Sequence, residues 1–167
     1  MSNIISEPRV QSLDMRYDHR GDLTELIHEY DLPGADDTTP GRFGQTYIVK
    51  SSIPLTIRAF HRHRRLWDYF TVVHGRARIW IVEGGSFEPN ALPTLEQPAV
   101  YQYILDGGNL ARLTIPPGYW HGWQSLEPNT IMVCTGSDVY NRNKPDEERV
   151  EYNIFEEFGV FWNIKPS

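Results

Sequence analysis

The segment His61-Arg62-His63-Arg64-Arg65-Leu66-Trp67-Asp68 decides the fold, and the segment Pro116-Pro117-Gly118-Tyr119-Trp120-His121 completes the pattern. Written as patterns, the two are H-x-H-x4-D-x6-G, which ends at Gly75, and P-x-G-x2-H. Side chains two positions apart on a strand point to the same face, so we expect His61 and His63 to lie together. Asp68 shares a face with Phe70 for the same reason. The two segments therefore predict strands that bring polar groups to one face of a sheet.

These polar groups have two interpretations. If the shared face is the interior of a barrel, His121 joins His61, His63 and Asp68 from a neighbouring strand. Three imidazole nitrogens and one carboxylate oxygen suit a divalent transition metal, which would make these four residues a metal site. In the alternative, one histidine of the H-x-H pattern points inward and the other is a surface residue in a basic run. The spacing leaves both interpretations open.

The rest of the chain predicts an all-β protein. Short runs of β-branched and aromatic residues are separated by Gly, Pro, Asp and Asn, which is typical of a sandwich or barrel. We expect strands at 23–27, 45–49, 55–63, 71–73, 79–82, 99–104, 111–115 and 131–135. Gly75 is expected to form the turn of a hairpin between the strands at 71–73 and 79–82. The stretches 31–42 and 84–95 are expected to be loops, the second a long hairpin connection.

Length and composition limit the classes of protein that are possible. The 167 residues predict a single domain, residues 1–167, that can bury a sizeable core. A formal net charge of -6 argues against nucleic acid as a partner, because nucleic-acid binders concentrate positive charge. Cys134 is the only cysteine, which excludes an internal disulfide. The chain has no apolar run of membrane-spanning length and no signal-peptide pattern, so we expect a cytoplasmic protein with no membrane partner.

The two opening patterns resemble the signature motifs of the cupin superfamily, which implies an antiparallel jelly-roll β-barrel. From about Asp18 to Trp162, the chain also resembles the dTDP-4-dehydrorhamnose 3,5-epimerase family. This resemblance rests on the segments Asp18-His19-Arg20-Gly21-Asp22-Leu23-Thr24-Glu25, Phe43-Gly44-Gln45, Arg58-Ala59-Phe60-His61 and Ile115-Pro116-Pro117-Gly118-Tyr119-Trp120-His121-Gly122-Trp123. Nearer the C-terminus it rests on Tyr140, Pro145, Glu147, Tyr152-Asn153 and Trp162.

The resemblance implies an isomerase without cofactor that acts on a dTDP-4-keto-6-deoxyhexose. A base removes the proton next to the ketone, and an acid returns a proton on the opposite face. The family's base aligns with His61, and neutral imidazole is a sensible base. Arg20 and Arg58 would bind the diphosphate, because guanidinium groups match phosphate oxygens. The partner is thus a small nucleotide sugar, and a homodimer is expected by analogy. The predicted substrate contacts are Arg20, Glu25, Gln45, Tyr47, Arg58, Trp120, His121 and Cys134.

Two positions depart from the pattern of that family. Its catalytic tyrosine aligns with Cys134, and a lysine that helps to polarise the ketone aligns with Asp68. A thiol is shorter than a phenol, and a carboxylate inverts the charge, so we do not expect the mechanism to be copied unchanged. The candidate replacement acids are His63, Tyr140 and Tyr47, and paired histidines resemble those of the related 3,4-ketoisomerases. Cys134 could itself act as the acid, but a lone buried cysteine is more often a small apolar filler.

Three functions stay open from the sequence. The leading one is the isomerase, with His61, His63 and Tyr140 as catalytic residues. The second is a metal-dependent cupin enzyme, in which a divalent metal polarises a carbonyl in place of the missing lysine. The third is a cupin that binds a sugar without catalysis. In each case Tyr119 and Trp120 are expected at the cavity, since aromatic faces stack on sugars and bases.

Overall fold

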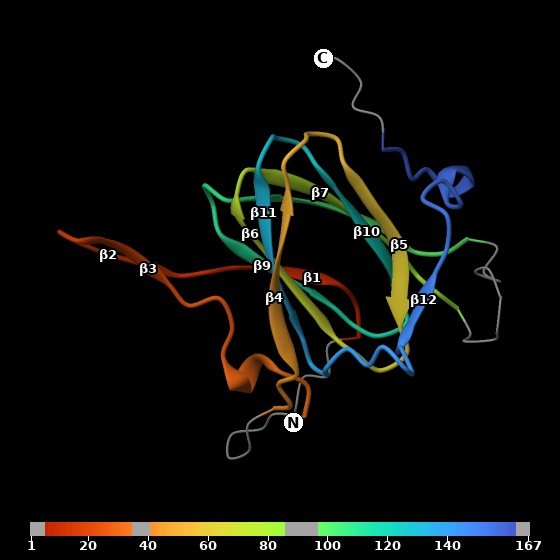
Figure 1. Ribbon diagram of the computed structural model, residues 1–167, viewed down its shortest axis with the longest axis horizontal. Helices are drawn as coiled ribbons and strands as arrows, with labels where there is room; N and C mark the ends of the chain where they lie inside the picture. Colours follow the sequence, from red (N-terminus) through yellow and green to blue (C-terminus); the bar gives the residue numbers. More distant parts are fainter. Residues whose placement is uncertain (1–5, 35–40, 86–96, 163–167) are drawn as a thin grey trace.

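The computed structural model describes residues 6–34, 41–85 and 97–162. These residues form twelve β-strands and two short 3-10 helices, so the predicted all-β class is confirmed (Figure 1). The first strands are β1 (Arg9–Ser12), β2 (Met15–Asp18), β3 (Gly21–Thr24), β4 (Gln45–Ser51), β5 (Ile57–His63) and β6 (Asp68–His74). The others are β7 (Arg76–Val82), β8 (Val100–Asp106), β9 (Ala111–Ile115), β10 (Trp120–Ser125), β11 (Thr130–Gly136) and β12 (Glu147–Arg149). The 3-10 helices are η1 (Glu29–Asp31) and η2 (Glu156–Phe158).

Two five-stranded antiparallel sheets form the body of the molecule. One sheet has the order β1-β9-β6-β11-β4, and the other has the order β12-β5-β10-β7-β8. Apart from β7 and β8, neighbouring strands in these orders are not consecutive in the sequence, which is the topology of a jelly roll. The predicted antiparallel jelly-roll β-barrel is therefore confirmed. Strands β7 and β8 pair with each other, as the expected hairpin connection requires, and residues 86–96 of that connection lie outside the described part.

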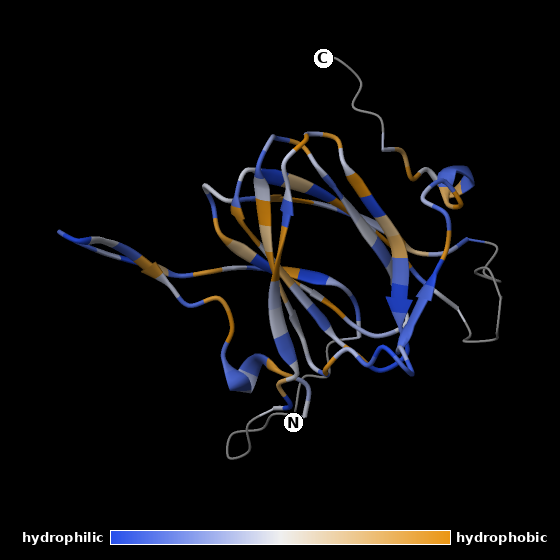
Figure 2. Ribbon diagram, in the orientation of Figure 1, coloured by the Kyte–Doolittle hydropathy of each residue, from blue (hydrophilic) through white to orange (hydrophobic). Residues whose placement is uncertain are grey.

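Alternating side chains of both sheets fill the space between them. This core contains Phe70, Ile79, Ile81, Leu113 and Met132, all of which are at most 2% exposed. Burial of one such side chain contributes about 1.5–3 kcal/mol. Figure 2 shows the matching hydrophobic stretches along the strands of both sheets. The core therefore holds the strands in the register that positions the polar residues described below.

A second core lies on the other face of the sheet that contains β5 and β10. Phe60 and Trp120 there contact Phe155, Val160 and Trp162 from the C-terminal part of the chain. The ring centroids of Phe60 and Phe155 are 4.9 Å apart. Strand β10 is consequently buried along its whole length, with the barrel core on one face and the C-terminal segment on the other.

The turn at Gly75 corrects one prediction. Gly75 does separate two strands, but β6 pairs with β9 and β11 whereas β7 pairs with β8 and β10. The residue has a φ of 70°, and a Cβ added there would lie 2.7 Å from Thr130 Oγ1. Only glycine adopts this left-handed backbone without strain, and here the chain turns from one sheet into the other. The turn signal in the sequence was correct, but the hairpin inferred from it was wrong.

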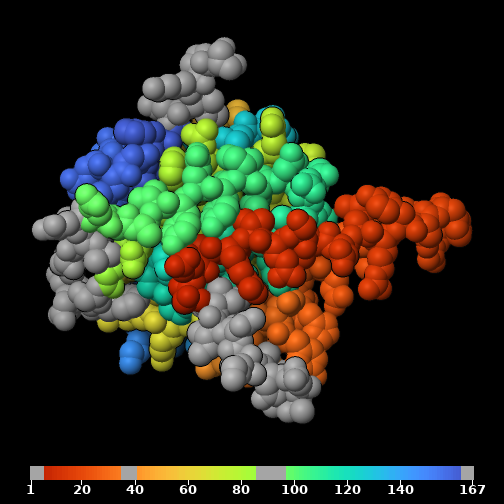
Figure 3. All heavy atoms as spheres, turned by 180° about the vertical axis from the view of Figure 1, so that it is seen from behind, coloured from red at the N-terminus to blue at the C-terminus, as the bar shows by residue number. Residues whose placement is uncertain are grey.

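Strands β2 and β3 form a hairpin that projects from the body as an arm (Figures 1 and 3). Its residues Tyr17 and Leu23 are 76% and 62% exposed. The tip of the hairpin is hydrophilic (Figure 2). The sequence predicted a strand at 23–27, but the strand begins earlier, at Gly21, and ends at Thr24.

Candidate active site

A cavity of about 690 Å³ opens between the two sheets. This volume lies within the usual range for small-molecule sites. The cavity brings together eight of the predicted site residues from strands β4, β5, β6 and β11 and from the segment after β11. These eight are Gln45, Tyr47, Arg58, His61, His63, Asp68, Cys134 and Tyr140.

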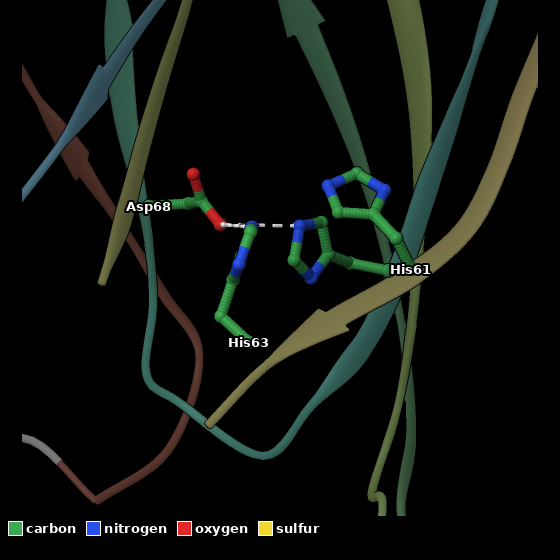
Figure 4. Close-up of side chains that lie close together, drawn as sticks. His61, His63 and Asp68 are labelled. Atoms are coloured by element: carbon green, nitrogen blue, oxygen red, sulfur yellow. Dashed lines mark ion pairs between the residues drawn. The ribbon is translucent and has the colours of Figure 1, made fainter. Parts of the chain in front are cut away.

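Three histidines and one carboxylate cluster at this cavity. His61 and His63 come from β5, Asp68 comes from the start of β6, and His121 of β10 is paired with His61 in the strand register. The ring centroids of His61 and His121 are 4.2 Å apart, and those of His61 and His63 are 5.4 Å apart. Figure 4 shows how His61, His63 and Asp68 point toward one another. His121 is 1% exposed and packs against the His61 ring without lining the cavity itself.

Backbone carbonyls fix the tautomers of two of these histidines. Nδ1 of His63 lies 2.6 Å from the carbonyl oxygen of Asp146, and Nδ1 of His121 lies 3.0 Å from the carbonyl oxygen of Tyr119. A carbonyl oxygen can only accept, so each Nδ1 carries the hydrogen and donates it. In the neutral form of either ring, Nε2 therefore has a free lone pair.

Both of these Nε2 atoms face the same oxygen. Asp68 Oδ2 lies 3.4 Å from Nε2 of His63 and 3.3 Å from Nε2 of His121. A lone pair and a carboxylate oxygen repel each other, so this approach is favourable only when a positive charge lies between them. The charge can be a proton on Nε2 or a metal ion. Nε2 of His121 has no partner in hydrogen-bond geometry among the described residues.

His61 has the character of a neutral base. Burial lowers its pKa well below the ordinary value, and the nearby His121, His63 and Arg149 lower it further. A histidine of this kind is unprotonated near neutral pH and can accept a proton from a substrate. The structure thus places His61, which the family resemblance suggests as the base, in the wall of the cavity.

A phenol and a thiol meet at another wall of the cavity. Tyr47 of β4 lies directly opposite Cys134 of β11 in the strand register, and both residues line the cavity. Burial raises the pKa of the Cys134 thiol to about 12, and the charge of Asp68 adds to this effect. Burial also raises the pKa of Tyr47. Tyr47 lines the cavity, and its raised pKa keeps the phenol protonated near neutral pH.

Two arginines line the cavity. Arg58 packs its guanidinium over Trp123, with 5.8 Å from Cζ to the ring centroid, and the described residues contain no carboxylate in an ion pair with it. Arg149 of β12 is paired with Glu147. The predicted site omitted Trp123, Glu147 and Arg149, all of which line the cavity. Alternation from His121 could have identified Trp123, because residues 121 and 123 share a face of β10.

Four predicted residues lie away from the cavity. Trp120 precedes His121 on β10, so its ring points to the opposite face and packs in the second core. Tyr119 contacts Tyr101 and donates a hydrogen bond to the carbonyl oxygen of Ser6. Arg20 is on the projecting hairpin and pairs with Asp18, and Glu25 lines a separate cavity of about 180 Å³. Within one chain, these residues do not contribute to the cavity that contains His61.

The fold and the cavity define a jelly-roll protein with a histidine-lined pocket of the size of a small-molecule site. Comparisons with known proteins show which jelly-roll proteins the chain resembles. No model of a known protein family matches the chain. The chain is 26% identical over 156 residues to the probable low-salt glycan biosynthesis epimerase Agl13 of Haloferax volcanii, covering 89% of each protein. It is 22% identical over 135 residues to the TDP-4-oxo-6-deoxy-alpha-D-glucose-3,4-oxoisomerase of Aneurinibacillus thermoaerophilus, covering 81% of the chain and 82% of that enzyme.

A solved structure agrees with these relatives. The dTDP-4-dehydrorhamnose 3,5-epimerase of Bacillus anthracis, solved with TDP and PPi bound, superposes with a TM-score of 0.74 at 23% identity. The match covers 95% of the chain and 86% of that structure. The predicted resemblance to the dTDP-4-dehydrorhamnose 3,5-epimerases is confirmed, and the proteins that the chain resembles are sugar epimerases and isomerases.

Proposed function

We propose that the protein is an isomerase or epimerase of a 4-keto-6-deoxyhexose linked to a nucleoside diphosphate, of the dTDP type. The observation that carries this proposal is His61, a cavity histidine whose pKa is well below its usual value. Such a residue can abstract a proton next to a ketone. The relatives support the proposal, because both are sugar epimerases or isomerases.

The reaction needs a proton donor and a positive charge as well as a base. His61 takes the proton from the carbon next to the ketone, and the electron pair moves onto the ketone oxygen as an enolate. Tyr47 or His63 returns a proton to carbon and completes the isomerisation. A protonated His63, held by Asp68, also supplies the positive charge that an enolate requires. Tyr47 is a candidate donor because it lines the cavity and burial keeps its phenol protonated.

Arg58 supplies a contact for the diphosphate. It lines the cavity on the same strand as His61, and Trp123 supports its guanidinium. A guanidinium without a carboxylate partner is available to bind phosphate oxygens in a bidentate manner.

Hydrogen exchange with solvent tests this function. The protein is incubated with dTDP-4-keto-6-deoxyglucose in D2O, and the sugar protons are followed by NMR. Deuterium at C3 and C5 indicates double epimerisation, and deuterium at C3 alone indicates a single epimerisation or a 3,4-ketoisomerisation. The matched control for His61→Ala is His74→Ala, which removes an exposed histidine outside the cavity lining. No exchange above the enzyme-free rate, or full exchange by His61→Ala, would contradict the proposal.

A metal-assisted isomerase is the second candidate, and one observation favours it. The free Nε2 lone pairs of His63 and His121 converge on Asp68 Oδ2, and ligand atoms of these residues and His61 lie within 4.8 Å of one another. Metal-binding histidines commonly donate the other ring N–H to a carbonyl, as both do here. His61, His63, Asp68 and His121 therefore fit a divalent transition metal, which would polarise the ketone when bound.

Cobalt binding separates the two candidates without an activity assay. Protein stripped with chelator is titrated with Co²⁺, and the visible absorption of an imidazole-ligated ion is recorded. The metal candidate requires one bound ion per chain and loss of that absorption in His63→Ala, with His74→Ala unchanged. An unchanged spectrum on addition of Co²⁺ to the wild-type protein eliminates this candidate and leaves the protonated His63–Asp68 pair.

The proposal also covers the oligomeric state and the cellular location of the protein. We propose a homodimer in which the β2–β3 arm contacts a second copy, supported by its exposed Tyr17 and Leu23. Light scattering on the wild-type protein and on a Tyr17→Ser, Leu23→Ser variant tests this arrangement. Within the described residues, no helix has the length and apolar character needed to span a membrane. A cytoplasmic location stays a prediction.

A further inference from the structure

Strand β12 places a charged pair at the cavity beside the catalytic histidines. It runs antiparallel to β5, with Glu147 opposite His63 and Arg149 opposite His61. Alternate residues of a strand share a face, so Glu147 and Arg149 turn toward the cavity, and Glu148 turns away to pair with Arg62. Neither Glu147 nor Arg149 was expected at the site as a ligand contact.

The charge of Arg149 acts within the cavity. It is one of the causes that lower the pKa of His61, which places the guanidinium in electrostatic range of that ring. Arg58 lines the same cavity from β5. Two arginines from neighbouring strands thus flank His61, and the arrangement suits a ligand with two adjacent negative phosphates.

Arg149 can exchange its carboxylate partner, Glu147, for another anion. The Arg149 side chain is 76% exposed, whereas that of Glu147 is 12% exposed. The guanidinium is therefore at the solvent side of the cavity, and the carboxylate is within it. Because the guanidinium is exposed, a second anion can reach it from solvent and compete with the carboxylate for it.

We propose that Arg149 gives the site its specificity for a diphosphate by binding this group together with Arg58. Glu147 holds Arg149 over the cavity until the diphosphate takes the place of the Glu147 carboxylate. This inference rests on the proposed function, because it takes a nucleoside diphosphate sugar as the ligand. Arg20, which the sequence suggested for this role, is on the projecting arm and does not line the cavity of its own chain.

Calorimetric titration with dTDP tests the inference without turnover. We expect Arg149→Gln to weaken dTDP binding about tenfold to a hundredfold, since a hydrogen bond to a charged group is worth about 1.5–3 kcal/mol. Binding of thymidine, which has no phosphate, should be unchanged. Glu147→Gln should bind dTDP at least as tightly as the wild type, because it releases Arg149. The matched control is Arg76→Gln, which removes an exposed arginine that pairs with Glu127 elsewhere.

The outcomes separate this inference from the proposed function. Wild-type protein that does not bind dTDP overturns both. Wild-type binding that Arg149→Gln retains within twofold overturns the inference alone. If Glu147→Gln weakens dTDP binding as strongly as Arg149→Gln, the pair serves only to fix β12 and the exchange does not occur. An equal loss of thymidine and dTDP affinity in Arg149→Gln would assign the effect to cavity structure and also overturn the inference.

Discussion

Replacement of Glu148 by alanine should destabilise the protein through the buried Arg62. The Arg62 side chain is 0% exposed, and its guanidinium contacts Glu148 at 2.7 Å. Loss of one partner from a buried ion pair typically costs about 3–5 kcal/mol, because the remaining charge is uncompensated. Arg62 keeps its hydrogen bond to the Gly84 carbonyl oxygen at 2.6 Å and its contact with the Trp120 ring at 4.5 Å. Because these contacts remain, we expect a loss somewhat below that range, about 2–3 kcal/mol.

Urea unfolding followed by tryptophan fluorescence measures this loss directly. For a chain of this size, about 2–3 kcal/mol corresponds to a drop in Tm of about 5–10 °C. Glu156→Ala, on an exposed turn of η2, is the matched control and should change stability by less than about 0.5 kcal/mol. If Glu148→Ala matches this control, Arg62 does not depend on Glu148 and the reasoning fails.

The same pair predicts a pH dependence. Partial burial raises the pKa of Glu148, but hydrogen bonds from Arg62 and Arg64 outweigh this effect and leave the pKa below its usual value. A carboxyl with a lowered pKa stabilises the fold above its unfolded pKa of about 4.3, and the contribution is lost as the pH falls through the folded pKa. The difference between wild type and Glu148→Ala should therefore be full at pH 7 and shrink in acid. A difference that grows below pH 4 would contradict this assignment.

Three further predictions follow from packing and from the cavity. Gly122→Ala should lower the free energy of unfolding in urea by about 1–3 kcal/mol, because the added Cβ would lie 2.2 Å from the Ala59 Cβ. The control Gly108→Ala, in an exposed turn, should change this free energy little. Cys134, buried and with a pKa of about 12, should react with iodoacetamide at pH 8 only after unfolding; rapid labelling of the native protein would show that the thiol is accessible. Tyr47→Phe should lower the turnover number more than Tyr140→Phe does, since Tyr47 is on a strand of the cavity wall and burial keeps its phenol protonated; the reverse order would identify Tyr140 as the acid.

The sequence predicted the elements that depend on local pattern. Alternation placed His61 and His63 on one face of β5, and the cavity lies on that face. The strand at 111–115 was predicted with its observed bounds. These features follow from the two-residue period of a strand, which is visible without tertiary information.

Features that depend on pairing between distant segments could not be predicted in the same way. Strand β12 has only three residues, and its role becomes visible only from its register with β5. Trp120 was expected at the cavity because it adjoins His121, yet adjacent residues of a strand face opposite sides. Whether the turn at Gly75 forms a hairpin depends on which sheet β7 joins. The residues of the turn contain no information about that pairing.

Strand β5 connects the cavity to a C-terminal part of the chain that does not line it. His61 and His63 face the cavity, whereas Phe60 and Arg62 face Phe155, Trp162 and Glu148. A change in the C-terminal cover can therefore move both histidines without altering any residue of the cavity wall. Substitutions in residues 155–162 are thus a second way to change the positions of His61 and His63, from the face of β5 that is turned away from the cavity.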